Sequence, residues 1–313
     1  MSLLRLTYLM ACLLSLCVSA VPARAQSIEH IQSILEKAVA TPTDKDALKE
    51  RLQELETALG GRTDVALGEY SRGWILSHLG RNEESVAAYD RATALNPKMG
   101  GAWYNAGVLL SDMGRIPEAI EHYKESLRVD PSYTDAAYNL GQIFYNQKDF
   151  VTALDWWQKA RTLSPEDFGA VKKVLQAQNA LGRWEDAEVT REEVFRLHRE
   201  SKDASIRVLK EYCFDQFDID KLHVFAYETF EPAGEDAVLY TFRATWPDAK
   251  VIGVVTIVNL GKEPTKPGPC RLDVKVGGKK SGDPVRLKSL PDYPALKERI
   301  RLLVRKHILP SVK

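Results

Sequence analysis

Two stretches of the chain, PKMGGAWYNAG at residues 97–107 and PSYTDAAYNLG at residues 131–141, resemble each other closely. Their prolines are separated by 131 − 97 = 34 residues, and Pro165 follows after another 165 − 131 = 34 residues. Self-similarity at a fixed step of about 20–50 residues is typical of proteins built from stacked supersecondary units. The sequence therefore predicts a repeat architecture in the middle of the chain.

Other positions keep the same step, and each has a packing reason. Small residues allow two antiparallel helices to approach closely, a large aromatic side chain fills the space between neighbouring units, and proline ends one helix before the next unit. The columns are Gly73, Gly107 and Gly141; Ser85, Ala119, Ala153 and Ala187; Tyr89, Tyr123 and Trp157; and Gly80, Gly114 and Gly182 at a turn, where Lys148 is the exception.

These residues, and above all the segments at 102–107 and 137–141, resemble the tetratricopeptide repeat family from about Ala66 to Arg199. The resemblance implies a right-handed α-solenoid of about four helix-turn-helix repeats over residues 66–199. The last repeat departs from the pattern, because Leu175 replaces the glycine and Arg199 stands where a proline is expected. We therefore expect this repeat to be a solvated cap.

The N-terminal segment has the features of an export signal. Arg5 precedes an apolar run from Leu6 to Val18, and Ala23 and Ala25 are small residues at the positions that a signal peptidase reads. The apolar run is shorter than the roughly 20 residues that span a bilayer. We expect a signal peptide over residues 1–25, cleavage after Ala25, a periplasmic location, and a helical cap over residues 26–65.

After Arg199 the repeat is lost and the hydrophobic period changes to two, so residues 200–313 are predicted to form a separate α+β domain. Short connections predict a small antiparallel β-meander, and an amphipathic helix from Pro294 is expected to close over it. This region shows no family resemblance. The predicted strands are Leu222–Phe230, Ala237–Trp246, Val251–Leu260, Cys270–Val276 and Val285–Leu290. The predicted breaks are 231–234, 247–248, 261–269 and 277–284.

Cleavage of the signal peptide leaves Cys213 and Cys270 as the cysteines of the mature chain. In an oxidising compartment they are a possible disulfide, and two buried thiols are the alternative. Residues 26–200 contain 21 basic and 28 acidic side chains, whereas the formal net charge of the whole chain is zero. This balance gives no support to nucleic-acid binding. Direct contact with a membrane is not expected either, and the sequence does not indicate an oligomeric state.

The family resemblance also implies a partner site, because the first helix of each tetratricopeptide pair faces a concave groove. Aromatic rings and amides on that surface can hold an extended peptide at low entropic cost. The same tyrosines and asparagines can alternatively serve the stacking of the helices. The predicted groove residues are Tyr70, Trp74, Tyr104, Asn105, Tyr138, Asn139, Gln142, Tyr145, Lys172 and Gln176.

The sequence shows no phosphate-binding loop, nucleophile elbow, paired-cysteine metal pattern or closely spaced histidines, so no catalytic residue, cofactor or metal is predicted. Glu228 lies beside an aromatic residue, and we interpret it as a charge at the edge of a strand. We expect a non-enzymatic scaffold that binds a protein or an extended peptide. The alternative is that the C-terminal domain is a ligand-binding or hydrolytic module to which the repeats recruit substrate.

Overall fold

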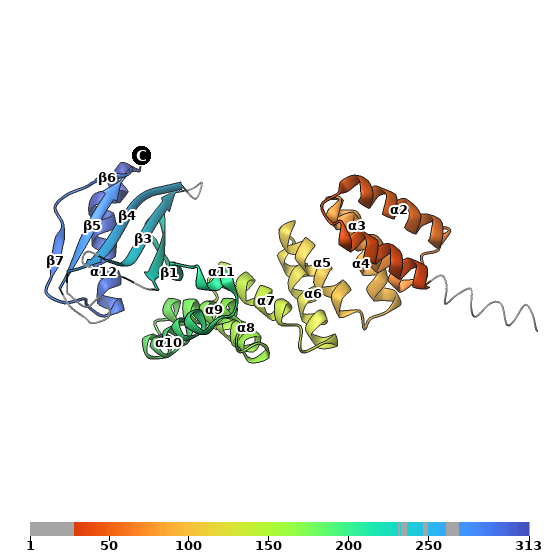
Figure 1. The fold of residues 1–313 in the computed structure, drawn as a ribbon, viewed down its shortest axis with the longest axis horizontal. Coiled ribbons are helices and arrows are strands. Elements are labelled where there is room, and N and C mark those ends of the chain that lie inside the picture. The colour runs from red at the N-terminus through yellow and green to blue at the C-terminus, as the bar shows by residue number, and fades with distance from the viewer. Residues whose placement is uncertain (1–27, 231, 233–236, 247–249, 261–268, 313) are drawn as a thin grey trace, which may run out of the picture. The chain divides into compact units, whose positions relative to one another are not determined.

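The computed structural model describes residues 28–230, 232, 237–246, 250–260 and 269–312 (Figure 1). The expected signal peptide and most of the breaks at 231–234, 247–248 and 261–269 lie outside these residues. The described chain divides into two compact units, which we call the N-terminal unit (residues 28–140) and the C-terminal unit (residues 141–312). This division follows spatial contacts, whereas the predicted boundary at residues 199 and 200 marks the end of the repeat pattern.

The predicted order of helices, antiparallel sheet and final helix is confirmed. A helix over residues 28–40 is followed by α2 (Lys45–Leu59), α3 (Ala66–His78), α4 (Asn82–Leu95), α5 (Gly100–Asp112), α6 (Ile116–Val129), α7 (Thr134–Asn146), α8 (Phe150–Leu163), α9 (Phe168–Ala180), α10 (Trp184–Glu200) and α11 (Ala204–Arg207). The strands are β1 (Glu211–Ile219), β2 (Leu222–Thr229), β3 (Val238–Trp246), β4 (Lys250–Asn259), β5 (Cys270–Val276), β6 (Lys279–Lys280) and β7 (Val285–Leu287), and α12 (Tyr293–Leu303) continues into η1 (Val304–Ile308) and η2 (Leu309–Ser311).

The turn column of the repeat adopts one backbone conformation. Gly80, Gly114 and Gly182 have φ values of 80°, 76° and 72°, and Lys148 occupies the same left-handed region with φ 64°. Only glycine enters this region without a steric penalty from Cβ. The periodic glycines therefore have a physical cause, and Lys148 is the position where the repeat accepts backbone strain.

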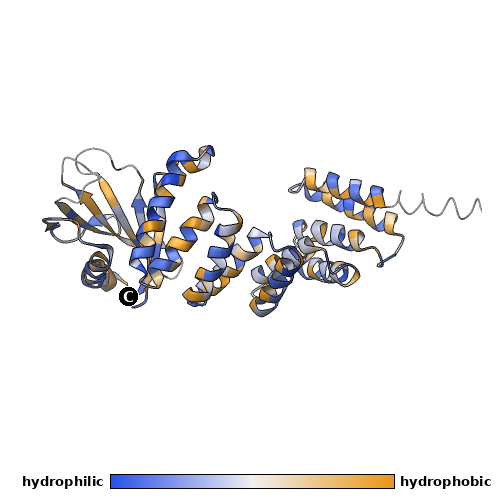
Figure 2. Cartoon of the chain, turned by 90° about the horizontal axis from the view of Figure 1, so that it is seen from below, coloured by the Kyte–Doolittle hydropathy of each residue, from blue (hydrophilic) through white to orange (hydrophobic). Residues whose placement is uncertain are grey.

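The core of the N-terminal unit forms between helices that are amphipathic, as the alternation of orange and blue along them shows (Figure 2). Ile31, Ile34 and Ala38 of the first helix pack with Leu48 and Leu55 of α2 and the start of the repeats. Further along, the aromatic Tyr89 packs with the small residues of α5. The expected helical cap is thus joined to the repeats through a continuous apolar contact.

The sheet is an antiparallel meander in the order β1-β2-β3-β4-β5-β6, and β7 pairs with β5. Phe242 faces Val255 and Tyr240 faces Ile257, as the alternation predicts. Strict alternation along the predicted strand Val251–Leu260 also places Val251 on this same face, and this prediction is wrong. The β3–β4 register shifts between Ala244 and Thr245, and this irregularity leaves Val251 45% exposed.

Two further features of the C-terminal unit differ from the sequence analysis. The first is β1, which was not predicted, because a register shift between Cys213 and Asp215 breaks the alternation of its residues. The second is the last helical pair, which is not a solvated cap. Leu175 of α9 and Val194 of α10 are buried in one core with residues of the sheet. The sheet therefore covers the apolar surface on which a further repeat would otherwise stack.

The final helix closes over the sheet as expected, and Figure 1 shows α12 beside the strands. Its apolar stripe, Leu296 and Ile300, continues through Val304 and Ile308 into the core of the C-terminal unit. Ile308 comes so near to Gly253 of β4 that a Cβ atom there would lie 2.7 Å from the isoleucine side chain. In the described part of the chain, no helix is long and apolar enough to cross a bilayer.

Candidate functional site

Four of the predicted groove residues form a ladder of hydrogen bonds between successive helices, together with two tyrosines of the aromatic packing column. The Asn105 amide on α5 donates to the hydroxyl of Tyr70 on α3 and to that of Tyr89 on α4, each at 3.4 Å. One 34-residue step later, Asn139 donates in the same way to Tyr104 at 3.5 Å and to Tyr123 at 3.3 Å. We call these six residues and Tyr133 the tyrosine–asparagine ladder.

The ladder has a structural role, because each asparagine ties one first helix to the preceding pair. Both donors of each amide group are used, since an asparagine side chain has two N–H groups and one carbonyl oxygen. In the described chain, no acceptor is present for the hydroxyl hydrogens of Tyr70 and Tyr104, and no donor for the carbonyl oxygens of Asn105 and Asn139. The ladder thus stabilises the stack and also keeps polar capacity for a ligand.

Tyr133 belongs to the same surface, although the sequence analysis missed it. Its ring centroid lies 5.0 Å from that of Tyr104, and a Cβ atom added to Gly101 would lie 3.8 Å from the Tyr133 hydroxyl and 3.6 Å from that of Tyr70. Tyr133 precedes α7 at a position that Met99 and Asp167 occupy in the neighbouring repeats, so no column marks it. A side chain introduced at position 101 would thus come within van der Waals distance of two tyrosine hydroxyls.

Trp74 and Tyr138 are the other predicted groove residues of the N-terminal unit, and both are half-buried. The Trp74 ring stacks on His78 with a centroid separation of 3.8 Å. Burial raises the pKa of the Tyr70 and Tyr104 hydroxyls, which keeps them protonated and able to donate at neutral pH. The role of these residues in partner binding stays a prediction.

The predicted groove residues of the C-terminal unit are engaged within the chain. Gln176 is only 3% exposed, and Asn179 on the same helix donates to the Phe214 carbonyl of β1 at 3.1 Å. The Lys172 ammonium lies 4.9 Å from the ring centroid of Phe168, and burial lowers its pKa. Strand β1 therefore lies against α9, and Gln176 offers little surface to a partner.

Gln142 and Tyr145 of α7 are also occupied by neighbouring side chains. Gln142 accepts a hydrogen bond from Lys173 at 2.7 Å, and the Tyr145 ring lies 5.2 Å from that of Trp157. The Tyr145 hydroxyl is buried and has no hydrogen-bond partner among the described residues. Tyr145 also lines a cavity of about 620 Å³, as does Arg301 of α12.

Cys213 and Cys270, the cysteines among the described residues, are free thiols. Cys213 lies on β1 and Cys270 on β5, with three strands between them, so at about 4.8 Å per strand they are roughly 19 Å apart in the sheet. A disulfide requires Cα atoms within about 7 Å. The possible disulfide is therefore not formed in this structure, and both cysteines are thiols.

Glu228 is not the charge at a strand edge that its sequence position suggested. It lies on β2, inside the sheet, and is 5% exposed. Its carboxylate accepts from the Tyr212 hydroxyl at 2.7 Å, the Tyr240 hydroxyl at 3.1 Å and Arg191 Nε at 3.1 Å. Burial raises the pKa of Glu228, and Arg191 opposes this shift.

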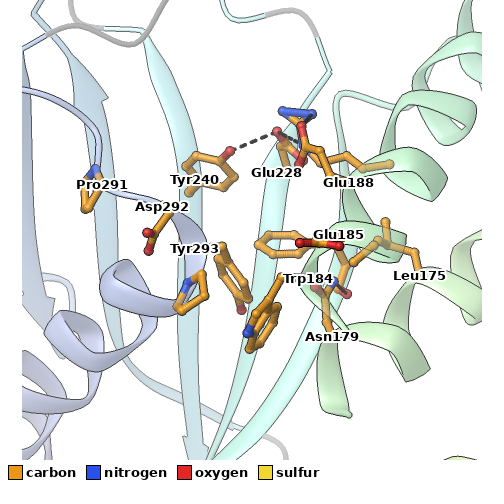
Figure 3. A pocket seen from close by; sticks show the side chains of 14 residues that line it. Leu175, Asn179, Trp184, Glu185, Glu188, Glu228, Tyr240, Pro291, Asp292 and Tyr293 are labelled. Carbon is orange, nitrogen blue, oxygen red and sulfur yellow. Dashed lines mark hydrogen bonds and ion pairs between the residues drawn. The ribbon is translucent and has the colours of Figure 1, made fainter. Parts of the chain in front are cut away.

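This network borders a cavity of about 420 Å³ between α10, the sheet and the start of α12 (Figure 3). Trp184, Phe214, Tyr240 and Tyr293 supply its aromatic walls. The sequence signal that could have identified this cavity is weak, since its four aromatic residues belong to four separate elements, α10, β1, β3 and α12. Among the described residues, no group of three or more His, Cys, Asp or Glu side chains could hold a metal ion.

Comparison with known proteins agrees with the helical geometry. Models of the tetratricopeptide repeat match residues 70–99 and 104–168. The chain contains tetratricopeptide repeats. The predicted resemblance is thus confirmed, and it supports a protein-interaction scaffold. Proteins with the tetratricopeptide fold are generally non-catalytic scaffolds. Curated protein sequences gave no match.

Several solved structures resemble about half of the chain. A crystal structure of MamA has 14% identity, covers 56% of this chain and 94% of its own, and gives a TM-score of 0.49. MamA from Desulfovibrio magneticus RS-1 has 19% identity, with 56% and 98% coverage and a TM-score of 0.48. YrrB, described as a TPR protein with an unusual peptide-binding site, has 15% identity, 50% and 80% coverage and a TM-score of 0.43. Neither identity nor TM-score is high enough to transfer a function.

Proposed function

We propose that the chain is an exported, periplasmic and non-enzymatic scaffold that binds an extended segment of a partner protein on the tyrosine–asparagine ladder. The observation that carries this proposal is the hydrogen-bond capacity that the ladder leaves unused. Tyr70 and Tyr104 each keep a hydroxyl hydrogen, and Asn105 and Asn139 each keep a carbonyl oxygen. A peptide backbone offers the matching carbonyl and N–H groups.

The spacing of the ladder suits an extended chain. Neighbouring helices in a stack lie about 8–10 Å apart. An extended peptide advances about 3.3 Å per residue, so roughly three of its residues would separate one donor–acceptor pair from the next. The half-buried rings of Tyr104 and Tyr133 add an apolar surface beside the polar groups. We therefore expect recognition of an extended segment, with about three residues per repeat.

The site should lie in the N-terminal unit rather than along all four helical pairs. Gln176 is buried and Gln142 is bound by Lys173, so the C-terminal unit offers few of the predicted contacts. This restriction separates the proposal from a groove that uses every repeat. It also leaves the C-terminal domain free for a second role.

The test of this proposal removes the hydroxyl groups of Tyr70 and Tyr104 and keeps their aromatic rings. The mature protein, carrying an affinity tag, is compared with the Tyr70→Phe, Tyr104→Phe double variant in capture from envelope extracts, followed by mass spectrometry. We expect one partner that the wild type captures and the double variant captures at least about fivefold less, since loss of two hydrogen bonds costs roughly 1–3 kcal/mol. Trp156→Phe, on α8, is the matched aromatic control. Equal capture by all three proteins would contradict the proposal.

The periplasmic location is tested separately. We expect the protein in the periplasmic fraction to begin at Gln26, which N-terminal sequencing determines directly. An intact N-terminus in the membrane fraction would contradict export with cleavage.

The second candidate function is ligand binding by the C-terminal domain. The cavity in Figure 3 favours it over hydrolysis, because Glu228, its most buried acid, is held by Arg191 and two tyrosine hydroxyls. A carboxylate bound in this way is poorly placed to exchange a proton with a substrate.

A further inference from the structure

The cavity of about 420 Å³ in the C-terminal unit is lined in part by aromatic side chains (Figure 3). The rings of Trp184 and Tyr293 meet edge to face, with centroids 5.7 Å apart and planes at 71°. Phe214 continues the wall, 4.9 Å from Tyr293 and 5.8 Å from Tyr240. Four connected aromatic side chains thus border one space that is large enough for a small ligand or a long side chain.

The charged groups around this space are predominantly acidic. Glu185, Glu188, Glu228 and Asp292 line the cavity, against the single cation Arg191, so the formal charge of the lining is −3. Arg191 is bound by Glu228 at 3.1 Å and by Glu188 at 3.0 Å. The Glu185 side chain is exposed and, in the described chain, makes neither a hydrogen bond nor an ion pair. The excess negative charge is therefore available to an incoming group.

The aromatic wall already lies close to one ammonium group. Lys297 Nζ lies 5.8 Å from the ring centroid of Tyr293 and 5.9 Å from that of Trp184. Its charge is bound by Asp215, which is fully buried, at 2.6 Å. The rings thus tolerate a cation nearby, and Lys297 does not neutralise the acids that line the cavity.

We propose that this cavity binds an organic cation, namely the ammonium or guanidinium group of a small molecule or of a basic side chain. Aromatic faces attract cations through the ring quadrupole, and carboxylates at the opening add charge complementarity. A neutral ligand of the same shape gains only the apolar contact. This site is separate from the tyrosine–asparagine ladder and does not depend on the proposed partner binding there.

The test uses the mature full-length protein with ¹⁵N-labelled tryptophan and follows the indole signal of Trp184, assigned by its absence in Trp184→Leu. The probes are the peptide acetyl-Gly-Lys-Gly-amide, its neutral counterpart acetyl-Gly-Gln-Gly-amide, and spermidine. We expect a saturable shift with at least one of the two cationic probes and none with the glutamine peptide. A response to the lysine peptide alone indicates a polypeptide source, and a response to spermidine alone indicates a small molecule.

Substitution of Glu185 tests the role of charge without disturbing the fold, because this side chain is exposed and unpaired. Glu185→Gln should weaken binding of the cationic probe about three- to tenfold, since a carboxylate near a cation at a partly exposed site contributes modestly. Asp186→Asn, one residue along and outside the cavity, is the matched control and should leave binding unchanged. The proposal would be overturned by equal shifts with the lysine and glutamine peptides or by no shift with any probe. It would also be overturned if Glu185→Gln and Asp186→Asn had equal effects on binding.

Discussion

The glycine column of the repeats makes a graded prediction about stability. A Cβ atom at Gly141 would fall inside the van der Waals radius of the Trp157 ring, which is fully buried. At Gly73 it would lie 2.8 Å from Tyr89, and at Gly107 3.0 Å from Tyr123. Because these rings are packed on all sides, they cannot move away without disturbing the core.

The magnitude follows from two opposing effects. Overpacking of a core costs about 1–3 kcal/mol, whereas replacing glycine by alanine within a helix contributes up to about 1 kcal/mol of stability. Gly141→Ala should therefore destabilise by about 2 kcal/mol, Gly73→Ala by about 1 kcal/mol, and Gly107→Ala by less. Gly101→Ala is the control, since its Cβ would meet atoms at ordinary contact distances and should be neutral or stabilising.

The assay is urea unfolding of each variant, followed by circular dichroism at 222 nm and by tryptophan fluorescence. Two probes are needed because repeat arrays can unfold in steps. We expect the unfolding midpoints to fall in the order Gly101→Ala, Gly107→Ala, Gly73→Ala, Gly141→Ala. The reasoning would be refuted if Gly141→Ala were as stable as Gly101→Ala, because the glycine column would then have no steric cause.

Three further predictions concern charges and thiols. Burial acts to lower the pKa of His122, but the hydrogen bonds of its ring, led by the one to Asp90, outweigh burial and raise the pKa. The stabilisation that protonated His122 contributes is therefore present in full below pH about 6.5 and is lost as the pH rises through the folded-state pKa. The stability advantage of wild type over His122→Gln should therefore shrink on titration towards pH 8 in thermal unfolding, and a constant difference would contradict this. Lys297→Met should destabilise by about 3–5 kcal/mol because it leaves Asp215 buried without its cation, and the Asp215→Asn, Lys297→Met double variant should recover part of the loss in urea unfolding. Burial raises the pKa of Cys213 to about 11, so its thiol should react slowly with iodoacetamide in the native protein, yet fully in urea without reductant; a need for reductant would show a disulfide.

The sequence was sufficient to predict the helical repeats because their residues recur at a fixed step. Each column at the 34-residue step corresponds to one packing position, and even the exception at Lys148 shares the left-handed turn of its glycine neighbours. Strands β2 to β5 were also predictable, since their residues alternate between the two faces of the sheet. The meander then followed from the short connections.

Strand β1 was missed because its alternation is broken where Asp215 is buried beside a register shift. A buried acid looks like a surface residue in the sequence, and only the structure brings Lys297 to it from α12. Glu228 was misread for the same reason, since its partner Arg191 comes from α10. Long-range ion pairs of this kind leave no local pattern.

The groove was predicted from residues that recur at the 34-residue step. Such a pattern does not show which repeats are covered by other parts of the chain. The burial of Gln176 depends on the docking of β1 against α9, which no repeat pattern encodes. Tyr133 was missed because it belongs to no column. The sequence thus identified Tyr70, Tyr104, Asn105 and Asn139 of the ladder as groove residues, but not Tyr133 or the extent of the accessible surface.

The most direct test of partner binding at the ladder is site-specific photocrosslinking in cells. A benzophenone amino acid replaces Gly101, which adjoins the hydroxyls of Tyr70 and Tyr133, and in a separate variant it replaces the exposed Lys124 of α6 as a control. We predict a discrete crosslinked envelope protein from position 101, absent from position 124 and lost when Tyr70→Phe and Tyr104→Phe are added. The same crosslinks from both positions, or none from position 101, would contradict a partner site on the tyrosine–asparagine ladder.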